Sequence, residues 1–431
     1  MDDKKTKLRI VKPSEPPPPE EDDPGPAAEE AAAEVDNEWM RDLLATKKGG
    51  IINCVANACV IVEQHPELAG KLVYNERSLT ALWKSPPPWG GSTTTVTDAD
   101  AVRASKWVAK HLHLNFADTA MEKALKTEAM AQSFDPVCQY LDGLRWDGHP
   151  RTSGWLSQHF GAEPSEYTRA IGQAWLISAV ARAFEPGCKA DYMLIIEGPQ
   201  GIGKTESLRA LAGDEFFAEV SIDPANKDTT VYVHGPWIVE WGEMAGLSRR
   251  EADSVKAFIS RRVDRFRPPY ARNAIDAPRR LVFAGTINEK TYLNDPTGNR
   301  RYWPFEAFDA DPVRLAEDRD QLWAEAAELY QSGASWWLTG DLAALAEGEQ
   351  LERADIDSWD EPIAELLAFR FADRDFVSVT EIYEAIGIEL RERRPSGYRR
   401  ISHIMRSRGW TPKTARLAPS GPDVRGFEPA R

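Results

Sequence analysis

Short apolar runs alternate with helical patterns through the middle of the chain, between residues 192 and 305. The run Tyr192–Ile196 is continuous and apolar, which is typical of a strand that is buried on both faces of a parallel sheet. Further strand-like runs and helical patterns follow it, at residues 206–211, 231–233, 237–240, 250–260 and 280–285. Strands that alternate with helices in this way predict a three-layer α/β domain.

The regions beside this domain show helical spacing of their apolar residues. Between residues 39 and 144 the pattern predicts a small, mostly helical domain with a loop at residues 86–91. Two more helices are expected at residues 167–184 and 322–330, and residues 347–360 form an acidic connector.

Three helical patterns occupy the C-terminal arm, at residues 362–372, 379–386 and 396–408. Their order, followed by a wing at residues 410–416, predicts a winged-helix module, and Ser396 is expected to cap the third helix. A basic helix that is merely solvated is the alternative. The cations on the outer face of this helix and on the wing, which we expect to face DNA, are Arg399, Arg400, Arg406, Arg408, Lys413 and Arg416.

These patterns divide the chain into five parts. Residues 1–37 combine a proline run, an acidic run and an Ala/Glu-rich stretch, a composition that predicts a disordered tail. The other parts are a helical N-terminal domain, an α/β core, a helical and acidic connector and a winged-helix-like domain, at residues 38–160, 161–310, 311–360 and 361–431.

Composition places the chain among ordinary globular proteins, with 42% hydrophobic and 28% charged residues. No stretch approaches the ~20 apolar residues of a membrane span, and Met1–Lys5 does not begin a secretory signal, so we expect a cytoplasmic protein without a membrane partner. Cys54, Cys59, Cys138 and Cys188 lack the spacing of a zinc site, so we expect reduced thiols, with the first two in the core of one helix.

The strongest local signal is a glycine-rich loop that begins two residues after the first predicted strand. Its residues Gly198, Pro199, Gln200, Gly201, Ile202, Gly203, Lys204 and Thr205 fit the pattern GxxxxGK[ST] between a strand and a helix. Glycines allow backbone N–H groups to surround phosphates, Lys204 reaches the β and γ phosphates, and the Thr205 hydroxyl binds Mg²⁺. The sequence therefore predicts an ATP and Mg²⁺ site.

Two later strands end in polar residues that suit the same site. Glu240 and Glu243 close the run that starts at Trp237. We assign the first to Mg²⁺ and the second to activation of the attacking water, and the reverse order is the alternative. Asn288 follows the strand Leu281–Ile287, where its amide can bind the γ-phosphate and orient the water.

Cations gather in two further places. Arg300 and Arg301 lie on a turn, and either can stabilise the phosphate of a neighbouring subunit or simply bond to local carboxylates. A second basic segment mixes cations with Phe266, which suits contact with a DNA backbone but also a salt-bridged helix face. Its candidate DNA contacts are Lys256, Arg261, Arg262, Arg265 and Arg267.

Taken in order, these motifs resemble the virulence-associated protein E family, which phages and mobile islands commonly carry. The motifs are residues 141–148, 186–189, 197–205, 237–243, 256–270, 285–288 and 298–304. The family looks related to the superfamily 3 helicases, hexameric ring ATPases of viral replication. The resemblance implies an α/β P-loop NTPase core of the AAA+/superfamily 3 type, with a helical N-terminal domain and a C-terminal winged-helix-like domain.

The same resemblance implies roles for individual residues. It makes Lys204 and Thr205 the phosphate and Mg²⁺ residues, Glu240 and Glu243 the acidic motif, and Asn288 the sensor. It makes Arg300 or Arg301 the finger that acts on a neighbouring subunit, and it turns Lys256 and its basic neighbours toward DNA.

The expected function is therefore an ATP-dependent DNA helicase or translocase for phage or mobile-element replication. It would work as a homo-oligomeric ring, which the resemblance implies is a hexamer, with a separate primase. One alternative is a P-loop switch or a kinase for a small substrate. The other is a non-catalytic protein that binds a replication origin or regulates replication through its C-terminal arm.

Overall fold

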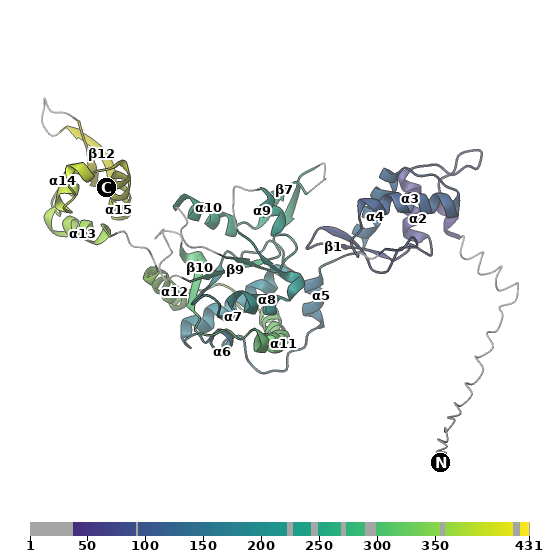
Figure 1. Ribbon diagram of the computed structural model, residues 1–431, viewed down its shortest axis with the longest axis horizontal. Coiled ribbons are helices and arrows are strands. Elements are labelled where there is room, and N and C mark those ends of the chain that lie inside the picture. The colour runs from purple at the N-terminus through teal and green to yellow at the C-terminus, as the bar shows by residue number, and fades with distance from the viewer. Residues whose placement is uncertain are drawn as a thin grey trace, which may run out of the picture. The chain divides into compact units, whose positions relative to one another are not determined.

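The computed structural model describes residues 38–91, 94–221, 227–242, 249–268, 273–288, 299–353, 358–416 and 423–430 (Figure 1). The chain divides between Asp135 and Pro136 into two compact units. Residues 136–160, which the sequence pattern placed with the N-terminal domain, contribute Val137, Trp155 and Phe160 to the core of the second unit. None of the described helices is both long and apolar enough to cross a bilayer.

The first unit combines helices with a small sheet, so the expectation of a mostly helical domain was incomplete. Its core lies between the helices and the sheet and includes Ile61, Trp107 and Met121. Cys54 immediately precedes α2 and Cys59 lies within it, both are half-exposed, and all four cysteines are free. The elements are η1 (Glu38–Asp42), α2 (Val55–Gln64), β1 (Leu72–Asn75), β2 (Thr80–Trp83), α3 (Asp98–Leu112), α4 (Asp118–Ala131) and β3 (Ser133–Phe134), and the sheet order is β2-β1-β3.

The second unit is built on a five-stranded parallel sheet with the order β10-β4-β9-β6-β5. The α/β architecture expected from the sequence is confirmed. The strands are β4 (Met193–Glu197), β5 (Phe217–Glu219), β6 (Ile238–Trp241), β9 (Val282–Ile287) and β10 (Tyr302–Glu306).

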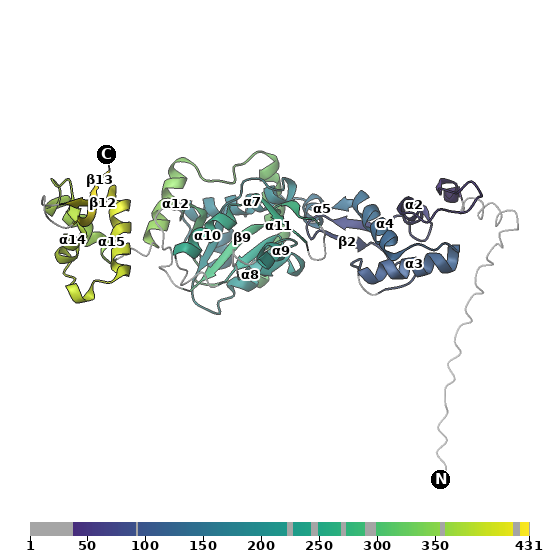
Figure 2. The same cartoon turned by 90° about the horizontal axis from the view of Figure 1, so that it is seen from above.

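Helices cover both faces of this sheet, and the alternation along β4 shows which residues meet which layer. Leu194 and Ile196 pack with α7 (Glu166–Phe184), α8 (Lys204–Ala212) and α11 (Pro312–Gln331). Met193 and Ile195 pack with α10 (Arg249–Ile259) and with Val233, which directly follows α9 (Lys227–Tyr232). Figure 1 shows the first group below the sheet and the second above it, and Figure 2 looks down on the second group. Burial of both faces explains the continuous apolar run of this strand.

Further elements complete the second unit around the sheet. The antiparallel pair β7 and β8 forms a separate two-stranded sheet. These elements are α5 (Pro136–Gly143), α6 (Trp155–Phe160), η2 (Asp214–Phe216), β7 (Val263–Phe266), β8 (Ile275–Pro278), η3 (Asn299–Arg301) and α12 (Gly340–Glu352).

Three secondary-structure predictions need correction. The strand expected at residues 231–233 is the end of helix α9, which stops at Tyr232, and the turn that follows it. Thr229 and Val233, four residues apart, are both buried, and the core overrides the strand propensity of this segment. The first part of the acidic connector is helix α12. The helix expected at residues 322–330 begins ten residues earlier, where Asp311 caps it and Pro312 occupies its first turn.

The described part of the C-terminal arm contains the α-helices α13, α14 and α15, the short helical elements η4 and η5, and a small antiparallel sheet with the order β11-β13-β12. Ile401, Ile404 and Met405 form the buried face of the last helix, as its pattern predicted. Arg394 occupies the N-cap position that we had assigned to Ser396, because Pro395 starts the helix. The elements are α13 (Asp360–Glu365), η4 (Leu366–Arg370), β11 (Val377–Ser378), α14 (Val379–Ala385), η5 (Leu390–Glu392), α15 (Pro395–Ser407), β12 (Trp410–Arg416) and β13 (Asp423–Pro429).

Candidate functional site

The glycine-rich loop connects the carboxyl end of β4 to the first turn of α8. Gly201 and Gly203 have positive φ angles of 83° and 96°, which side chains rarely adopt. At Gly198 the constraint is one of space, since a Cβ atom there would lie 2.4 Å from the carbonyl oxygen of Ala307. The loop therefore requires glycine at these positions, and it places free backbone N–H groups at a helix N-terminus, where anions bind favourably.

Lys204 is buried and bonds to the loop itself. Its Nζ donates to the carbonyl oxygens of Gly198 at 2.6 Å and Pro199 at 2.9 Å, and to Oδ1 of Asn288 at 2.9 Å. Burial lowers the pKa of the Lys204 ammonium. The bond to Asn288 joins residues 84 positions apart and brings together two of the predicted site residues.

Glu240 lies almost completely buried on β6, beside the loop. Its Oε1 accepts hydrogen bonds from the hydroxyl groups of Thr205 at 2.9 Å and Thr286 at 2.6 Å. Its Oε2 is buried and has no hydrogen-bond partner among the described residues. Burial raises the pKa of the Glu240 carboxyl, since the two hydroxyl bonds offset only part of the desolvation.

The arrangement fits a magnesium ion. Two adjacent ligands of an octahedral Mg²⁺ lie about 2.9 Å apart when each is about 2.05 Å from the metal. Thr205 Oγ1 and Glu240 Oε1 have this separation, and Glu240 Oε2 remains available as an acceptor. The described residues include no cluster of three or more His, Cys, Asp or Glu side chains, and a Mg²⁺ ion that is also bound by phosphates needs only one or two carboxylates.

Two features of this edge of the sheet were treated incompletely by sequence reasoning. Thr286 received no role, although it precedes Asn288 by two residues and alternation along a strand was a usable signal. Glu197, directly before the loop, bonds to Arg353 Nε at 2.5 Å and thereby ties the end of α12 to β4. Glu243 lies outside the described residues.

Arg300 and Arg301 lie at the opposite edge of the sheet from the loop. Tyr302, which follows them, pairs with Met193 at the start of β4, whereas the loop begins after Glu197 at its end. The intervening strand spans about 13 Å, which is more than an arginine side chain can bridge. The two arginines therefore cannot reach the glycine-rich loop of their own chain in this arrangement.

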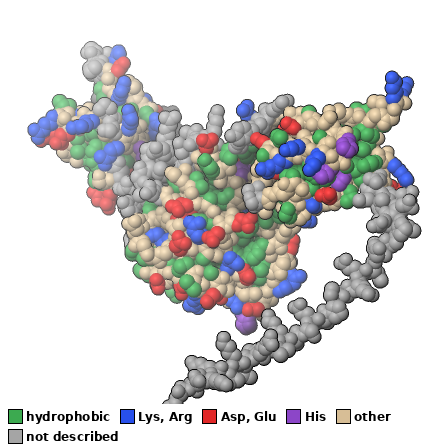
Figure 3. Space-filling model, turned by 45° about the vertical axis from the view of Figure 1, so that its right-hand side comes forward, with side chains coloured by type: hydrophobic (Ala, Val, Ile, Leu, Met, Phe, Trp, Pro, Cys, Tyr) green, Lys and Arg blue, Asp and Glu red, His purple; other side chains and the backbone are tan. Residues whose placement is uncertain are grey.

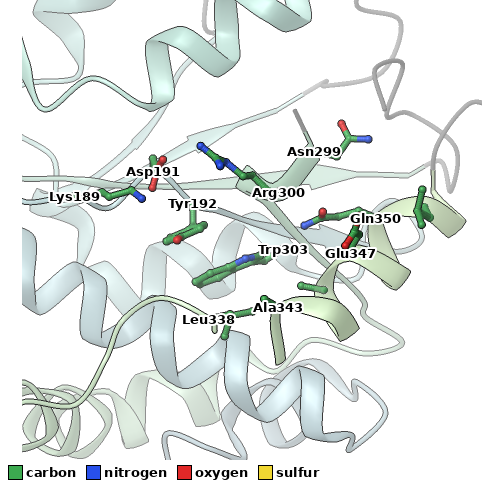
Figure 4. A pocket seen from close by; sticks show the side chains of 12 residues that line it. Lys189, Asp191, Tyr192, Asn299, Arg300, Trp303, Leu338, Ala343, Glu347 and Gln350 are labelled. Atoms are coloured by element: carbon green, nitrogen blue, oxygen red, sulfur yellow. The ribbon is translucent and has the colours of Figure 1, made fainter. Parts of the chain in front are cut away.

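The two arginines differ in their surroundings. Arg301 Nε donates to Ser260 Oγ at 2.5 Å, so this side chain is held within the chain. Arg300 is exposed and lines a cavity of about 460 Å³ beside the stacked rings of Tyr192 and Trp303. Figure 4 shows Arg300 at this cavity, between Asn299 and Asp191.

Most candidate DNA contacts in the basic segment have partners within the chain. Lys256 is buried, and Arg262 Nε donates to the carbonyl oxygen of Gly187 at 2.6 Å. The ion pairs are Arg261 with Asp264 at 3.7 Å and Arg265 with Asp276 at 3.8 Å. Arg267 is exposed and has no partner among the described residues. The structure therefore favours Arg267 over Lys256 as a contact for an external ligand.

A buried ion pair anchors the hairpin of β7 and β8. Arg279 donates from Nε and Nη2 to the two carboxylate oxygens of Asp264, at 2.6 and 2.9 Å, and both side chains are fully buried. Burial alone would raise the pKa of Asp264, but the hydrogen bonds from His234 and Arg279 outweigh it and lower the pKa to about 2.

The predicted DNA contacts of the C-terminal arm differ in their partners. Arg399 and Arg406 are exposed and have no partner among the described residues. Arg400 lies 3.9 Å from the ring centre of Trp359. The other three predicted contacts pair with acids: Arg408 with Asp360, Lys413 with Glu428, and Arg416 with Asp423. On the face drawn in Figure 3, acidic and basic side chains are likewise interspersed.

The fold and the site define a class of protein: a mixed α/β protein whose parallel sheet carries a glycine-rich loop and, at the same edge, a lysine, a buried glutamate and hydroxyl groups. The sequence model of the virulence-associated protein E-like domain matches residues 141–355, and the chain belongs to this family.

Other comparisons add little. No curated protein matches the sequence. Two solved apo structures of the NrS-1 C-terminal region are 9% and 12% identical, each with a TM-score of 0.47 and with 83% of this chain and 96% of theirs covered. A likeness of this strength supports no assignment.

Proposed function

We propose that this protein is an ATP-dependent DNA motor, a helicase or translocase, that serves the replication of a phage or mobile element. The observation that carries the proposal is the hydrogen-bonded group of Thr205, Glu240 and Thr286 beside the glycine-rich loop, with Lys204 bonded to Asn288. In our proposal this group forms the Mg²⁺ and phosphate site of a P-loop NTPase core.

Each side chain of this group has a distinct task. Lys204 exchanges the carbonyl oxygens of its own loop for the β and γ phosphates, while Thr205 and Glu240 hold the metal. Mg²⁺, when bound, neutralises the charge that develops on the phosphates. Asn288 orients the γ-phosphate or the attacking water, and Glu243 activates that water.

A ring explains the position of Arg300. A trans-acting arginine must be exposed and must lie away from the phosphate site of its own chain, and Arg300 meets both conditions. Arg301, bonded to Ser260, is better suited to fixing the turn. We therefore propose Arg300 as the finger that reaches the ATP of an adjacent subunit, in a homo-oligomer that the family resemblance suggests is a hexamer.

DNA is the proposed partner of the hairpin and of the C-terminal arm. Arg267 next to β7 and the arginines Arg399 and Arg406 on α15 are exposed cations without internal partners among the described residues. The order of α13, α14, α15 and the β12–β13 hairpin is consistent with a winged-helix-like domain. Priming would come from a separate primase.

The test is ATP hydrolysis by the purified chain, with and without single-stranded DNA, together with mass by light scattering in the presence of MgATP. We expect hydrolysis that DNA accelerates and an assembly with the mass of a ring. A monomer that hydrolyses or transfers phosphate without regard to DNA would contradict the motor and support a P-loop switch or kinase. DNA binding without any hydrolysis would support a regulatory or origin-binding protein.

A further inference from the structure

A groove between α8 and the first turns of α11 presents apolar side chains to solvent. Val313 is 70% exposed, and with Ala210, Pro312 and Ala316 it lines a groove of about 630 Å³. Single exposed apolar residues are common on protein surfaces. The four apolar side chains that line this groove form a surface on which a flat ligand can lie, and binding sites for small molecules are usually lined by apolar side chains.

The groove lies next to the end of the glycine-rich loop. Glu206, the residue after Thr205, lies at its rim. On the other wall, a Cβ atom built on Gly203 would lie 3.8 Å from Pro312 Cδ, which is ordinary contact distance. A molecule held by the loop therefore needs to extend by only one or two groups to enter the groove.

The polar residues of the site fix the direction in which such a molecule extends. Glu240 on β6 and Asn288 after β9 lie on one side of β4 and mark the γ-phosphate end. On the other side of β4, strand β10 leads through residues 307–311 into α11. A triphosphate whose γ-phosphate faces Glu240 must direct its nucleoside toward α11.

We propose that this groove binds the nucleobase of the triphosphate, and this proposal rests on the proposed ATPase function. The base lies against Val313 and Pro312 on one side and against Ala210 on the other. The carboxylates of Glu206 and Glu317 lie at the rim, where they accept hydrogen bonds from an exocyclic amino group. Arg209 Nε lies 3.7 Å from Glu206 Oε2 and forms an ion pair with it, so the Glu317 carboxylate serves as the second acceptor.

This chemistry favours adenine among the common bases. Adenine offers an amino group on its outer edge and no carbonyl oxygen, whereas uracil directs carbonyl oxygens outward, where they would meet the rim carboxylates. We therefore expect the wild-type protein to bind ATP more tightly than UTP. Equal affinity for the two would contradict the role of Glu206 and Glu317.

The experiment compares binding of MgATP and of magnesium tripolyphosphate by calorimetry. Tripolyphosphate has the phosphates and lacks the nucleoside. Ala316→Trp fills the groove from an exposed position, and we expect it to weaken ATP binding at least about tenfold while tripolyphosphate binding stays within about twofold. Ala344→Trp, at an exposed alanine of α12, is the matched control and should change neither affinity.

Four results would overturn the groove. The first is wild-type ATP affinity in Ala316→Trp. The second is an equal loss of affinity for both ligands in Ala316→Trp and in the milder variant Val313→Ser. That result would mean that these residues support the structure of the glycine-rich loop and do not contact the base. The third is selective loss of ATP binding in Phe308→Ala alone, because Phe308 is another exposed apolar side chain, 61% exposed, and it follows Ala307, whose carbonyl oxygen lies against Gly198.

The fourth result is a wild-type protein that does not distinguish the two ligands, and its two possible forms separate this inference from the function on which it rests. A wild-type protein that binds neither ATP nor tripolyphosphate removes both the proposed ATPase and its base site. A wild-type protein that binds both ligands with the same affinity keeps the phosphate site and removes only the base site.

Discussion

The carboxyl edge of the central sheet and the basic surfaces of the chain were predicted by the same kind of reasoning but differ in the structure. At the sheet edge, Lys204, Thr205, Glu240 and Asn288 come from three segments and are joined by hydrogen bonds. On the basic surfaces, most of the predicted DNA contacts have acidic or carbonyl partners within the chain.

The difference reflects what a local sequence pattern specifies. A glycine-rich loop between a strand and a helix determines where its lysine and threonine lie, and parallel strands bring their carboxyl ends to the same edge. A run of cations determines no such geometry, because each cation can pair with an acid from anywhere in the fold. The sheet edge is therefore the better-supported functional site, and the predictions below test that ranking.

Among the variants that leave the glycine-rich loop intact, we expect the largest loss of ATP hydrolysis at Arg300. Arg300→Ala should keep ATP binding and lose hydrolysis by about 10³- to 10⁵-fold, because a trans-acting arginine stabilises the transferring phosphate. Arg301→Ala, at the residue bonded to Ser260, should lose less than about tenfold. Steady-state hydrolysis and nucleotide titration distinguish the two variants.

Mixing tests the trans geometry directly. Arg300→Ala and Lys204→Ala should each be inactive alone. In an equal mixture of the two variants, roughly a quarter of the subunit interfaces combine an intact glycine-rich loop with an intact arginine from the neighbouring subunit, so roughly a quarter of the wild-type hydrolysis rate should return. A mixture as inactive as its components would contradict a finger supplied by the neighbouring subunit.

The buried pair Asp264–Arg279 should matter for stability rather than for DNA. Arg279→Ala should lower the free energy of unfolding by about 3–5 kcal/mol, because it leaves the Asp264 carboxylate buried without its main partner. Arg265→Ala, in an exposed ion pair of the same hairpin, should cost less than about 1 kcal/mol. Urea denaturation measures both, and equal losses would contradict the distinction.

The same pair predicts a pH dependence. Because the pKa of Asp264 is lowered to about 2, its stabilising contribution is fully present above its ordinary pKa of about 3.9 and is lost as the pH falls toward 2. The difference in stability between wild type and Arg279→Ala should therefore shrink over this interval. A difference that stays constant from pH 5 to pH 2 would argue against the ion pair as its source.

Glu240→Gln tests the proposed metal site. The amide oxygen can still accept from Thr205 and Thr286, so stability should change little, but the negative charge for Mg²⁺ is lost. We expect hydrolysis to fall at least about 100-fold and the Mg²⁺ concentration needed for ATP binding to rise. Hydrolysis at the wild-type rate would remove Glu240 from the site.

The smallest effect is expected on DNA binding. The double variant Arg399→Ala/Arg406→Ala should weaken binding by about tenfold and reduce the slope of log affinity against log salt by about 1.8 for duplex DNA, as expected for two lost phosphate contacts. Lys413→Ala/Arg416→Ala removes cations that already have acidic partners and should have a smaller effect. Fluorescence anisotropy at several salt concentrations checks both, and a larger loss in the second variant would reverse the assignment.

The α/β architecture, the alternation of strands and helices and the place of the glycine-rich loop between β4 and α8 could be predicted from the sequence, because periodicity and glycine spacing report local backbone geometry. It missed the small sheet of the N-terminal unit, whose strands β1, β2 and β3 are only two to four residues long and give little periodic signal. It also read residues 231–233 as a strand, where burial of Val233 instead stabilises a helix.

Contacts between distant residues were beyond what a single sequence gives. The bond between Arg353 and Glu197 joins residues 156 positions apart, and Arg279 forms an ion pair with Asp264 across a hairpin. Neither pair follows a spacing rule, because each depends on how separate elements pack. The groove beside α11 was missed for the same reason, since its walls come from two helices about 100 residues apart in the chain.

The most direct test of the central claim is ATP hydrolysis by Lys204→Ala beside Lys106→Ala. Lys106 is an exposed lysine on α3 and serves as a matched control for the loss of one ammonium group. The account predicts that Lys204→Ala abolishes hydrolysis and Lys106→Ala retains the wild-type rate. Hydrolysis by Lys204→Ala at the wild-type rate would show that the glycine-rich loop is not the site of the reaction.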